Sequence, residues 1–361
     1  MTIHRLHISN LRNLSDFSFQ PSPGINIFYG QNGAGKTSVL EAIHLLTHGR
    51  SFKSSRSRSL IAHDQTEATV FGEIASQPGV SLPVGISKDK EGKSQVRIGG
   101  ERVSAVSELA RLIPVQTLNS ESFALLEGSP KVRRQFLDWG VFHVEQSFLS
   151  AWHRAQKALK NRNTLLRSGN ISAPQLVAWD RELVAAANEV DSHRKRYLNS
   201  FQEQFYSLLN ELTDVGELSI SYQRGWDKTK TLAEVLTDSL PRDQKTGFTH
   251  AGPQRADLRL RLAKHNAADV LSRGQQKLVV AALKLSQGQN LITKNSQRRC
   301  VYLLDDLPAE LDFVHLKKIC GVLEEMNAQV FISCIEPDAI AECWKDMSRV
   351  QMFHVEHGTL K

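Results

Sequence analysis

Hydrophobic residues follow two different spacings along this chain. From residue 3 to about residue 115 they occur in short runs such as INIFYG, TEATVFGEI, VSLPVGIS and SQVRIGG, which glycine, proline and serine clusters separate. Runs of this length, rich in β-branched and aromatic side chains, are typical of strands. One helix is expected among them, because TSVLEAIHLL places Val39, Leu40, Ile43, Leu45 and Leu46 at helical spacing.

Between about residues 129 and 217 the hydrophobic residues instead recur every three or four positions, and glycine and proline are rare. These residues are Val144, Phe148, Trp152, Ala155 and Leu159, then Trp179, Leu183, Ala186 and Val190, then Leu198, Phe201, Phe205, Leu208 and Leu212. The break RSGNISAP, residues 167–174, predicts a turn between two helices. The strand-and-helix pattern returns from about residue 248. We therefore expect an α/β domain, residues 1–130 plus 248–361, with a helical domain, residues 131–247, inserted into it.

The stretch FYGQNGAGKTSVLEAIH, residues 28–44, carries the first candidate chemistry. Gly30, Gly35, Lys36 and Thr37 fit the pattern G-x-x-x-x-G-K-[ST] between a predicted strand and a predicted helix. Backbone N–H groups of such a loop can surround a phosphate, Lys36 can reach the β and γ phosphates, and the Thr37 hydroxyl can bind Mg²⁺. A glycine-rich turn that only caps a helix explains the flanking strand less well. The predicted loop comprises Gly30, Gln31, Asn32, Gly33, Ala34, Gly35, Lys36 and Thr37.

A second candidate segment, CVYLLDDLPAELD, supplies carboxylates. Val301, Tyr302, Leu303 and Leu304 predict a buried strand, and Asp305 at its end is suited to bind Mg²⁺, directly or through water. Asp306 is the candidate for polarising an attacking water. The alternative is that Asp305 and Asp306 only cap the end of the strand. Two adjacent carboxylates at a buried strand end are costly, however, unless a cation offsets their charge.

A third segment, LSRGQQKLVVAALKL, places Ser272, Gly274 and Gln275 at the start of a predicted apolar helix. Ser272 there can serve as an N-cap, and it can equally bind an anion.

Charge and cysteine content change this picture little. Lys and Arg number 45 and Asp and Glu number 38, so the formal net charge is +7, which suits a nucleic-acid partner but also many proteins that bind none. The four cysteines lie in the last 62 residues without a C-x-x-C pair, so neither zinc nor disulfides are suggested. No signal peptide or membrane helix is evident, and we expect a soluble, cytoplasmic protein.

These motifs resemble a known family. GQNGAGKT, LSRGQ and VYLLDD, with a helical insertion between the first two, are similar to the ABC-type ATPases of chromosome maintenance and DNA repair. LHISNLRN, GRSFKSSR, GSPKVRRQFLDW, THAGPQRADLRL and LLDDLPAELD together resemble the RecF family of bacterial recombination mediators, over nearly the whole chain. The resemblance implies an ABC-type P-loop ATPase head with a short, coiled-coil-like helical insertion.

The resemblance also implies a function. ATP would close a homodimer on DNA near single-strand gaps, and slow, DNA-stimulated hydrolysis would release it. RecR and RecO would be partners in loading the RecA recombinase, with a role in DNA replication restart and the SOS response.

Individual site roles follow from the same resemblance. Ser38 would lie beside the phosphates, and Gln116 in IPVQTL would sense the metal and the γ phosphate. Ser272, Gly274 and Gln275 would contact ATP bound to a second subunit. The residues expected near the subunit seam are Glu310, Leu311 and Asp312.

Two departures from the wider ATPase class are expected to slow hydrolysis. Asp306 stands where that class commonly has the longer glutamate, and RecF-like proteins resemble this chain in having aspartate there. After the strand QVFISC, many ABC ATPases have a histidine that contacts the γ phosphate, and Ser333 or a neighbour takes that place here.

Basic residues suggest a DNA surface. The candidates are Arg50, Lys53, Arg56 and Arg58, with serines between them, and Lys131, Arg133 and Arg134. Contacts from such residues to phosphates would be independent of base sequence and weakened by salt. Each of these side chains could equally be a solvated surface charge, so the DNA assignment depends more on the resemblance than on composition.

Two other functions remain as alternatives. The ATPase subunit of an ABC transporter would copurify with a membrane partner and show no ATP-linked DNA affinity. A small-molecule kinase would transfer phosphate to an acceptor and would have no use for LSRGQ.

Overall fold

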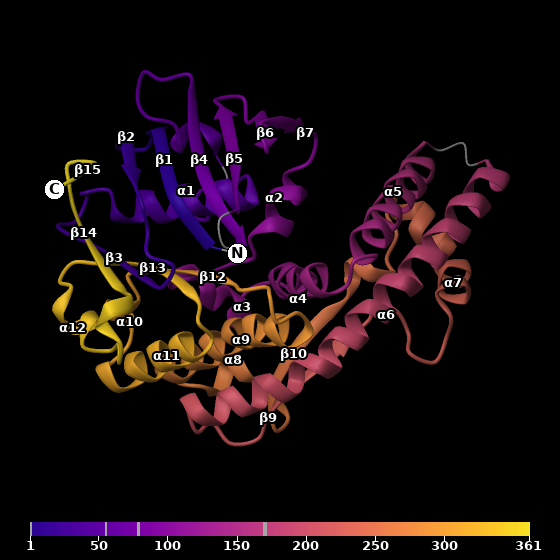
Figure 1. Ribbon diagram of the computed structural model, residues 1–361. Helices are drawn as coiled ribbons and strands as arrows, with labels where there is room; N and C mark the ends of the chain where they lie inside the picture. The colour runs from indigo at the N-terminus through magenta and orange to yellow at the C-terminus, as the bar shows by residue number, and fades with distance from the viewer. Residues whose placement is uncertain (1, 55, 78–79, 169–171) are drawn as a thin grey trace. The chain divides into compact units, whose positions relative to one another are not determined.

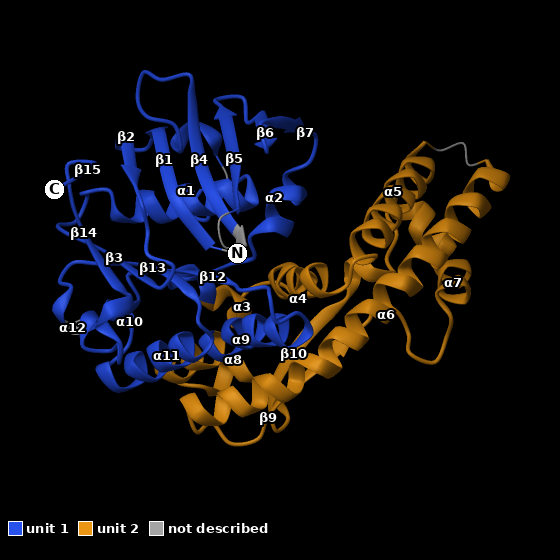
Figure 2. Ribbon diagram, in the orientation of Figure 1, with its two compact units in different colours: residues 1–122, 281–361 blue, residues 123–280 orange. Residues whose placement is uncertain are grey.

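The structure is a computed structural model that describes residues 2–54, 56–77, 80–168 and 172–361 (Figure 1). The chain forms two compact units (Figure 2). Unit 1 comprises Met1–Ser122 and Ala281–Lys361, and unit 2 comprises Phe123–Val280. The expected insertion, residues 131–247, lies wholly within unit 2, which extends beyond it on both sides. Unit 2 includes the residues after 247 because β10 (Asp257–Leu262) pairs with β9 (Leu218–Gln223).

Unit 1 contains two six-stranded sheets. The first is antiparallel in the order β2-β1-β4-β5-β6-β7, formed by β1 (Thr2–Leu11), β2 (Leu14–Phe19), β4 (Glu67–Gln77), β5 (Val80–Asp89), β6 (Ser94–Ile98) and β7 (Glu101–Val103). The second has the order β15-β14-β3-β13-β12-β8, formed by β3 (Ile25–Tyr29), β8 (Val115–Leu118), β12 (Val301–Asp305), β13 (Gln329–Cys334), β14 (Val350–Glu356) and β15 (Thr359–Leu360). The strands from β14 to β8 run parallel, so their carboxyl ends lie along one edge. The strands predicted at β3 to β6 and at β12 are confirmed.

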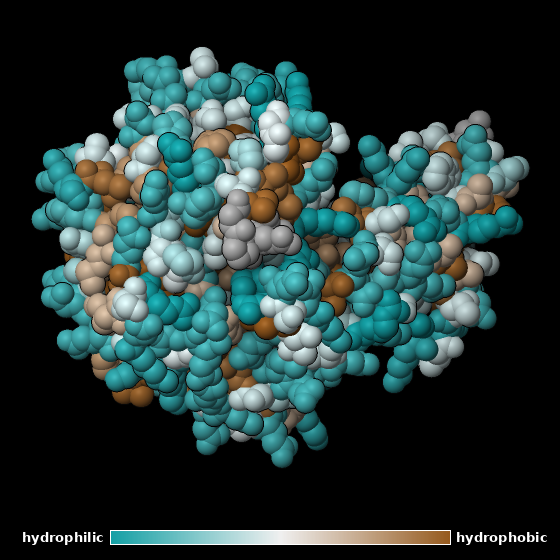
Figure 3. Space-filling view, in the orientation of Figure 1, coloured by the Kyte–Doolittle hydropathy of each residue, from teal (hydrophilic) through white to brown (hydrophobic). Residues whose placement is uncertain are grey.

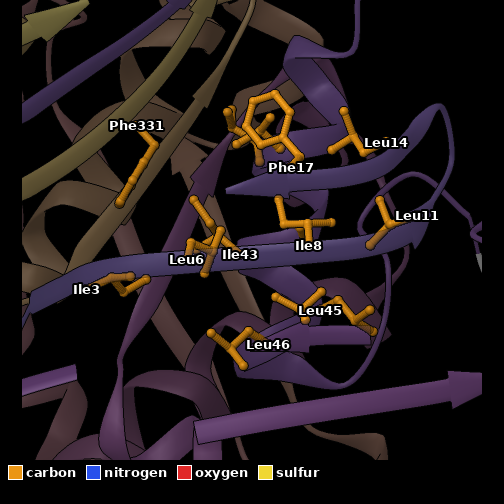
Figure 4. Close-up of a cluster of buried hydrophobic side chains, with 14 of the residues drawn as sticks. Ile3, Leu6, Ile8, Leu11, Leu14, Phe17, Ile43, Leu45, Leu46 and Phe331 are labelled. Atoms are coloured by element: carbon orange, nitrogen blue, oxygen red, sulfur yellow. The ribbon is translucent and has the colours of Figure 1, made fainter. Parts of the chain in front are cut away.

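Helix α1 (Lys36–His48) lies between the two sheets of unit 1. It contacts β1, β4 and β5 of the first sheet and β12 and β13 of the second. Its side chains Ile43, Leu45 and Leu46 share one hydrophobic cluster with Leu6 of β1 and Phe331 of β13 (Figure 4). A helix covered on both faces must be apolar nearly all round. This burial fixes the start of α1 beside the carboxyl edge of the parallel sheet.

Unit 2 is mainly helical. Its long helices are α4 (Pro130–Val144), α5 (Phe148–Arg167), α6 (Ala173–Leu212) and α7 (Leu232–Thr246). Helices α5 and α6 pack against each other, as a coiled-coil-like pair does. A single helix, α6, covers both hydrophobic runs that begin at Trp179 and Leu198. The predicted turn is confirmed at its two ends, where α5 stops and α6 begins, while residues 169–171 lie outside the described part of the chain.

The remaining helices are short, except α9 and α11. They are α2 (Val106–Leu112), α3 (Ala124–Glu127), α8 (Ala267–Val270), α9 (Arg273–Lys294), α10 (Leu307–Glu310), α11 (Phe313–Glu325) and α12 (Asp338–Ala341). The division between the units falls inside α9.

Hydrophilic residues cover most of the surface in view, and hydrophobic residues gather only in small groups (Figure 3). Within the described ranges, we find no helix with the length and apolar character that crossing a membrane requires.

Candidate nucleotide-binding site

The predicted phosphate loop connects β3 to α1 in unit 1. Gly30, Gly33 and Gly35 have φ angles of 143°, 81° and 117°, which L side chains rarely adopt. A Cβ on Gly30 would also lie 2.3 Å from the Val355 carbonyl oxygen. The backbone conformation therefore favours glycine at all three positions, and at Gly30 the available space does so as well. The loop leads directly into the N-terminus of a 13-residue helix.

The Lys36 ammonium is held inside this loop. Its Nζ donates hydrogen bonds to the carbonyl oxygens of Gly30 at 2.7 Å and Gln31 at 2.9 Å. Burial lowers the pKa of Lys36 from its ordinary value, and the nearby carboxylates of Asp306 and Asp305 act in the opposite direction. Among the described residues, Lys36 is thus a buried cation with two main-chain oxygens as its hydrogen-bond partners, and it can bind an anion that enters the loop.

Asp305 lies at the end of β12, as predicted, and meets the phosphate loop. Its Oδ1 accepts hydrogen bonds from the hydroxyl groups of Thr37 and Ser333, both at 2.7 Å. Thr37 is 268 positions away in the sequence, and the parallel pairing of β3, β13 and β12 brings the two together. The two predicted metal ligands are therefore adjacent.

Ser333 does not lie after the strand QVFISC, where the sequence predicts it or a neighbour. It lies within β13, fully buried, rather than after the strand. Its hydroxyl donates to Asp305 and accepts from the backbone N–H of Asp306 at 3.0 Å. Ser333 therefore contacts the Asp305 carboxylate and the Asp306 backbone, and it is too buried to contact a γ phosphate. The residue that follows the strand is the exposed Ile335.

Asp306 is exposed next to its buried neighbour Asp305. It adopts a left-handed conformation with φ of 55° and precedes α10, so its side chain leaves the sheet and lines the cleft described below. The two carboxylates hence have different environments, one hydrogen-bonded and one open to solvent.

A cleft of about 800 Å³ opens over the loop. Its lining residues from the predicted site are Asn32, Gly33, Gly35, Lys36, Thr37, Ser38, Lys53, Arg58 and Asp306. A volume of this size is typical of ligand pockets.

The sequence did not single out Arg12, Asn13 or the residues from Ile61 to Asp64, which also line the cleft. Arg12 forms a bidentate ion pair with the buried Glu41 at 2.9 and 2.8 Å. Asn13 donates to the Gly33 carbonyl oxygen and accepts from the Ser38 hydroxyl. The segment LHISNLRN, which contains Arg12 and Asn13, carries part of the family resemblance, but that resemblance implies no role for these side chains.

Lys53 contacts the carboxylate expected to bind metal. Its Nζ lies 3.7 Å from Asp305 Oδ2. A cation therefore fits beside Asp305, and the Thr37 and Asp305 oxygens are the hard donors that Mg²⁺ prefers. Among the described residues, no three His, Cys, Asp or Glu side chains gather into a metal site. Lys53 and Arg58, two of the predicted DNA contacts, both line the cleft over the predicted phosphate loop.

Gln116 lies apart from these residues. It pairs with Tyr302 in the β8–β12 register, three residues before Asp305, or roughly 10 Å from the sheet edge. Its buried amide donates to Gln287 Oε1 at 2.6 Å. The expected contact with metal or γ phosphate is therefore corrected. Asn119, which follows β8, lies closer to the edge where Asp305 ends its strand.

Ser272 and Gln275 form a capping box at the start of α9 in unit 2. The Ser272 hydroxyl accepts from the Gln275 N–H at 3.3 Å, and Gln275 Oε1 accepts from the Ser272 N–H at 3.0 Å. A Cβ built on Gly274 meets nothing within 4 Å, so the backbone there is open to approach. The N-cap interpretation is confirmed, with Ser272 exposed and Gln275 half-buried.

Two of the proposed DNA contacts are corrected by the structure. Arg133 forms a bidentate ion pair with Asp257 at 2.8 and 3.1 Å, and both side chains are largely buried. Arg134 donates to the Ala256 carbonyl oxygen at 2.7 Å, and burial lowers its pKa. Helix α4 presents these arginines to β10 rather than to solvent. Arg50, Arg56, Arg58 and Lys131 are exposed.

Comparison with known proteins decides the family. The model for the RecF/RecN/SMC N terminal domain matches residues 2–361. The DNA replication and repair protein RecF of Azotobacter vinelandii is 52% identical over 360 residues, which cover 100% of this chain and 98% of that protein. The chain belongs to the RecF family. A RecF-family protein of Pseudomonas aeruginosa, with the same name, is 50% identical over 99% of this chain and 97% of its own length.

Solved structures agree on the fold. The recombination mediator protein RecF with ATP, of the RecFOR pathway, aligns with a TM-score of 0.86 at 24% identity over 100% of this chain and 97% of that one. The Smc head domain of Pyrococcus yayanosii aligns with a TM-score of 0.58 at 13% identity over 100% and 96%. The expected ABC-type ATPase head is therefore confirmed for this RecF-family chain. The RecF relatives do not favour the transporter alternative.

Proposed function

We propose that this RecF-family chain is an ATP-dependent DNA-binding switch of recombinational DNA repair and replication restart. One observation carries the proposal: Lys36, Thr37 and Asp305 converge at one edge of a parallel sheet, beneath a glycine-rich loop at a helix N-terminus. That arrangement suits the triphosphate of a nucleotide. The RecF relatives, named for DNA replication and repair, supply the biological context.

Mg²⁺ fits the donor set of Thr37 and Asp305, because this ion is usually held by few protein oxygens together with phosphates and water. When bound, it would offset negative charge on the β and γ phosphates. Lys36 would exchange its carbonyl partners for those phosphates. Ser333 would hold Asp305 in orientation, and Asp306 would accept a hydrogen bond from the attacking water. Because aspartate is one methylene shorter than glutamate, we expect weak, switch-like ATPase activity.

The switch would act through a homodimer. Ser272, Gly274 and Gln275 would contact the γ phosphate on the second subunit, with Glu310, Leu311 and Asp312 near the seam, so ATP would close the dimer on DNA. Slow, DNA-stimulated hydrolysis would reopen it. RecR and RecO are the partners we propose, with RecA loading at single-strand gaps and the SOS response as the outcome, in the cytoplasm. Arg50, Lys53, Arg56, Arg58 and Lys131 stay predicted DNA contacts.

Fluorescence anisotropy of a labelled duplex tests the proposal. We expect ATP with Mg²⁺ to tighten binding by wild-type protein at near-physiological salt. In the Lys36→Arg variant this tightening should be lost, because the larger guanidinium does not fit the loop carbonyls in the same way. The variant without nucleotide serves as the control for residual DNA affinity. Equal affinity with and without ATP in the wild type would overturn the switch.

A further inference from the structure

The segment RADLRLRLAK, residues 255–264, alternates basic and apolar residues, and none of the roles described above uses its cations. It forms β10, the central strand of the sheet β11-β10-β9 in unit 2, where β11 is His265–Asn266. Leu258 and Leu260 are buried, while Arg259 and Arg261 are exposed. The alternation therefore places both arginines on the outer face of the sheet.

Hydroxyl groups lie beside these arginines. In the antiparallel register Ser221 pairs with Arg259, and Ser219 pairs with Arg261. Directly paired residues share a face of the sheet, and both serines are exposed. Cations with adjacent hydroxyls are the groups that most often bind phosphate oxygens of DNA. We call Ser219, Ser221, Arg259, Arg261 and Lys264 the β10 basic face.

A groove of about 250 Å³ adjoins this face. It is lined by Arg259, Arg261, Lys264 and Asn266, together with residues of α3 and α4 and the rest of β10. Among the described residues, Asp257 is the one carboxylate in its lining, and Arg133 already neutralises it. The groove thus combines a concave shape with an excess of positive charge.

Among the described residues, the cations of the β10 basic face are not neutralised by neighbouring carboxylates. Some exposed helical cations of the same unit are, as Arg154 is by Glu182 and Glu189, and Arg196 by Glu145. In the described part of the chain, Arg259, Arg261 and Lys264 have no ion-pair partner. Residues two apart on a strand are about 7 Å from each other, far enough to reach different phosphates.

We propose that the β10 basic face binds the phosphate backbone of duplex DNA, independently of base sequence. This inference rests on the proposed DNA-binding function and assigns it a surface that the sequence did not indicate. The sheet supports this role physically, because buried Leu258 and Leu260 hold the strand rigid and position both arginines before DNA arrives.

The test is anisotropy of a labelled duplex at several salt concentrations, with ATP and Mg²⁺, on the full-length chain. The Arg259→Gln/Arg261→Gln variant should bind roughly tenfold more weakly, and its slope of log affinity against log salt should be shallower by about two. The matched control is Arg242→Gln/Lys245→Gln, which removes two exposed cations from α7 of the same unit. It should bind as wild type does. The Arg259→Lys/Arg261→Lys variant keeps both charges and should keep the salt slope.

The outcomes separate the two proposals. One outcome is that wild-type protein binds duplex in an ATP-dependent manner while the Arg259→Gln/Arg261→Gln variant binds equally well. In that case the β10 basic face does not bind DNA, and the proposed function stands. If wild-type protein does not bind duplex, both are overturned. Far-UV circular dichroism and unchanged ATP affinity in each variant would exclude misfolding as the cause of lost binding.

Discussion

At the scale of single residues, the site depends on side chains that bind no ligand themselves. Ser333 is the clearest case, since one buried hydroxyl touches Asp305 and the backbone of Asp306 at once. Groups that orient a metal ligand commonly matter almost as much as the ligand. Its place within β13, rather than beyond it, is what makes this double contact possible.

Ser333→Ala should raise the Mg²⁺ concentration for half-maximal ATPase activity by about tenfold, because Asp305 loses an orienting donor. Nucleotide binding in the presence of a chelator should change little. Ser286→Ala is the matched control, since Ser286 is equally buried in unit 1 and bonds to the Ala282 carbonyl oxygen. An unaltered Mg²⁺ requirement in Ser333→Ala would contradict the orienting role.

We expect Arg133 to stabilise the folded protein rather than to contact DNA. Arg133→Gln should lower the free energy of unfolding by about 2 kcal/mol, because it leaves the largely buried Asp257 without its counter-charge. Asp257→Asn should have a similar effect. Because the two residues form one pair, the double variant should lose less than the sum of the two single losses. Urea unfolding of the four proteins measures this cycle, and strict additivity would exclude the coupling.

At the scale of elements, α1 supports the phosphate loop from the middle of unit 1. Its third turn carries His44, whose Nδ1 bonds to the Arg50 carbonyl oxygen at 2.7 Å and whose ring stacks on His48 at 4.2 Å. Burial lowers the pKa of His44 to about 4, while the hydrogen bond to the Arg50 carbonyl oxygen acts in the opposite direction. His44 is therefore neutral in the folded protein at neutral pH.

This burial predicts a loss of stability in mild acid. Between about pH 6.5 and 4 the unfolded chain binds a proton at His44 that the folded chain does not, so the free energy of unfolding falls as the pH falls. From pH 7 to 4.5 the expected loss is about 2 kcal/mol. Urea unfolding at both pH values should show a smaller loss for His44→Gln, which can still donate to the Arg50 carbonyl. The same loss in that variant would exclude His44 as the cause.

At the scale of the whole molecule, the three motifs belong to two units. The phosphate loop and Asp305 lie in unit 1, while the capping box of Ser272 and Gln275 lies in unit 2. The proposed dimer would use this box as a γ-phosphate contact in addition to its local capping role. Two substitutions at Ser272 can separate these roles.

Ser272→Ala should lower the free energy of unfolding by about 1 kcal/mol through loss of the cap. Ser272→Asp should keep the cap and the stability, but its negative charge should repel the γ phosphate and weaken ATP-dependent dimerisation by roughly tenfold. Light scattering after size exclusion measures dimerisation with ATP. Thr231→Asp is the matched control, because Thr231 forms the capping box of α7 in the same unit. Wild-type dimerisation by Ser272→Asp would argue against the γ-phosphate contact.

The sequence predicted helices, strands and motifs more completely than it predicted the contacts of single side chains. The spacing of hydrophobic residues located β3, β4, β12 and α5, because burial on one face or both imposes a period that the sequence must carry. Arg133 shows where such reasoning stops. A basic residue on a helix has the same local pattern whether it meets solvent or a carboxylate 124 positions away.

The sequence by itself determined the phosphate loop, the strand that ends at Asp305 and the family, because each depends on residue types at fixed local spacing. The tertiary structure decided which distant groups meet. It brought Thr37 to Asp305, placed Gln116 away from the sheet edge and placed Ser333 against the Asp305 carboxylate and the Asp306 backbone. The physical reason is strand register: pairing in the parallel sheet fixes which residue reaches the edge, and that pairing is a property of the fold rather than of any one segment.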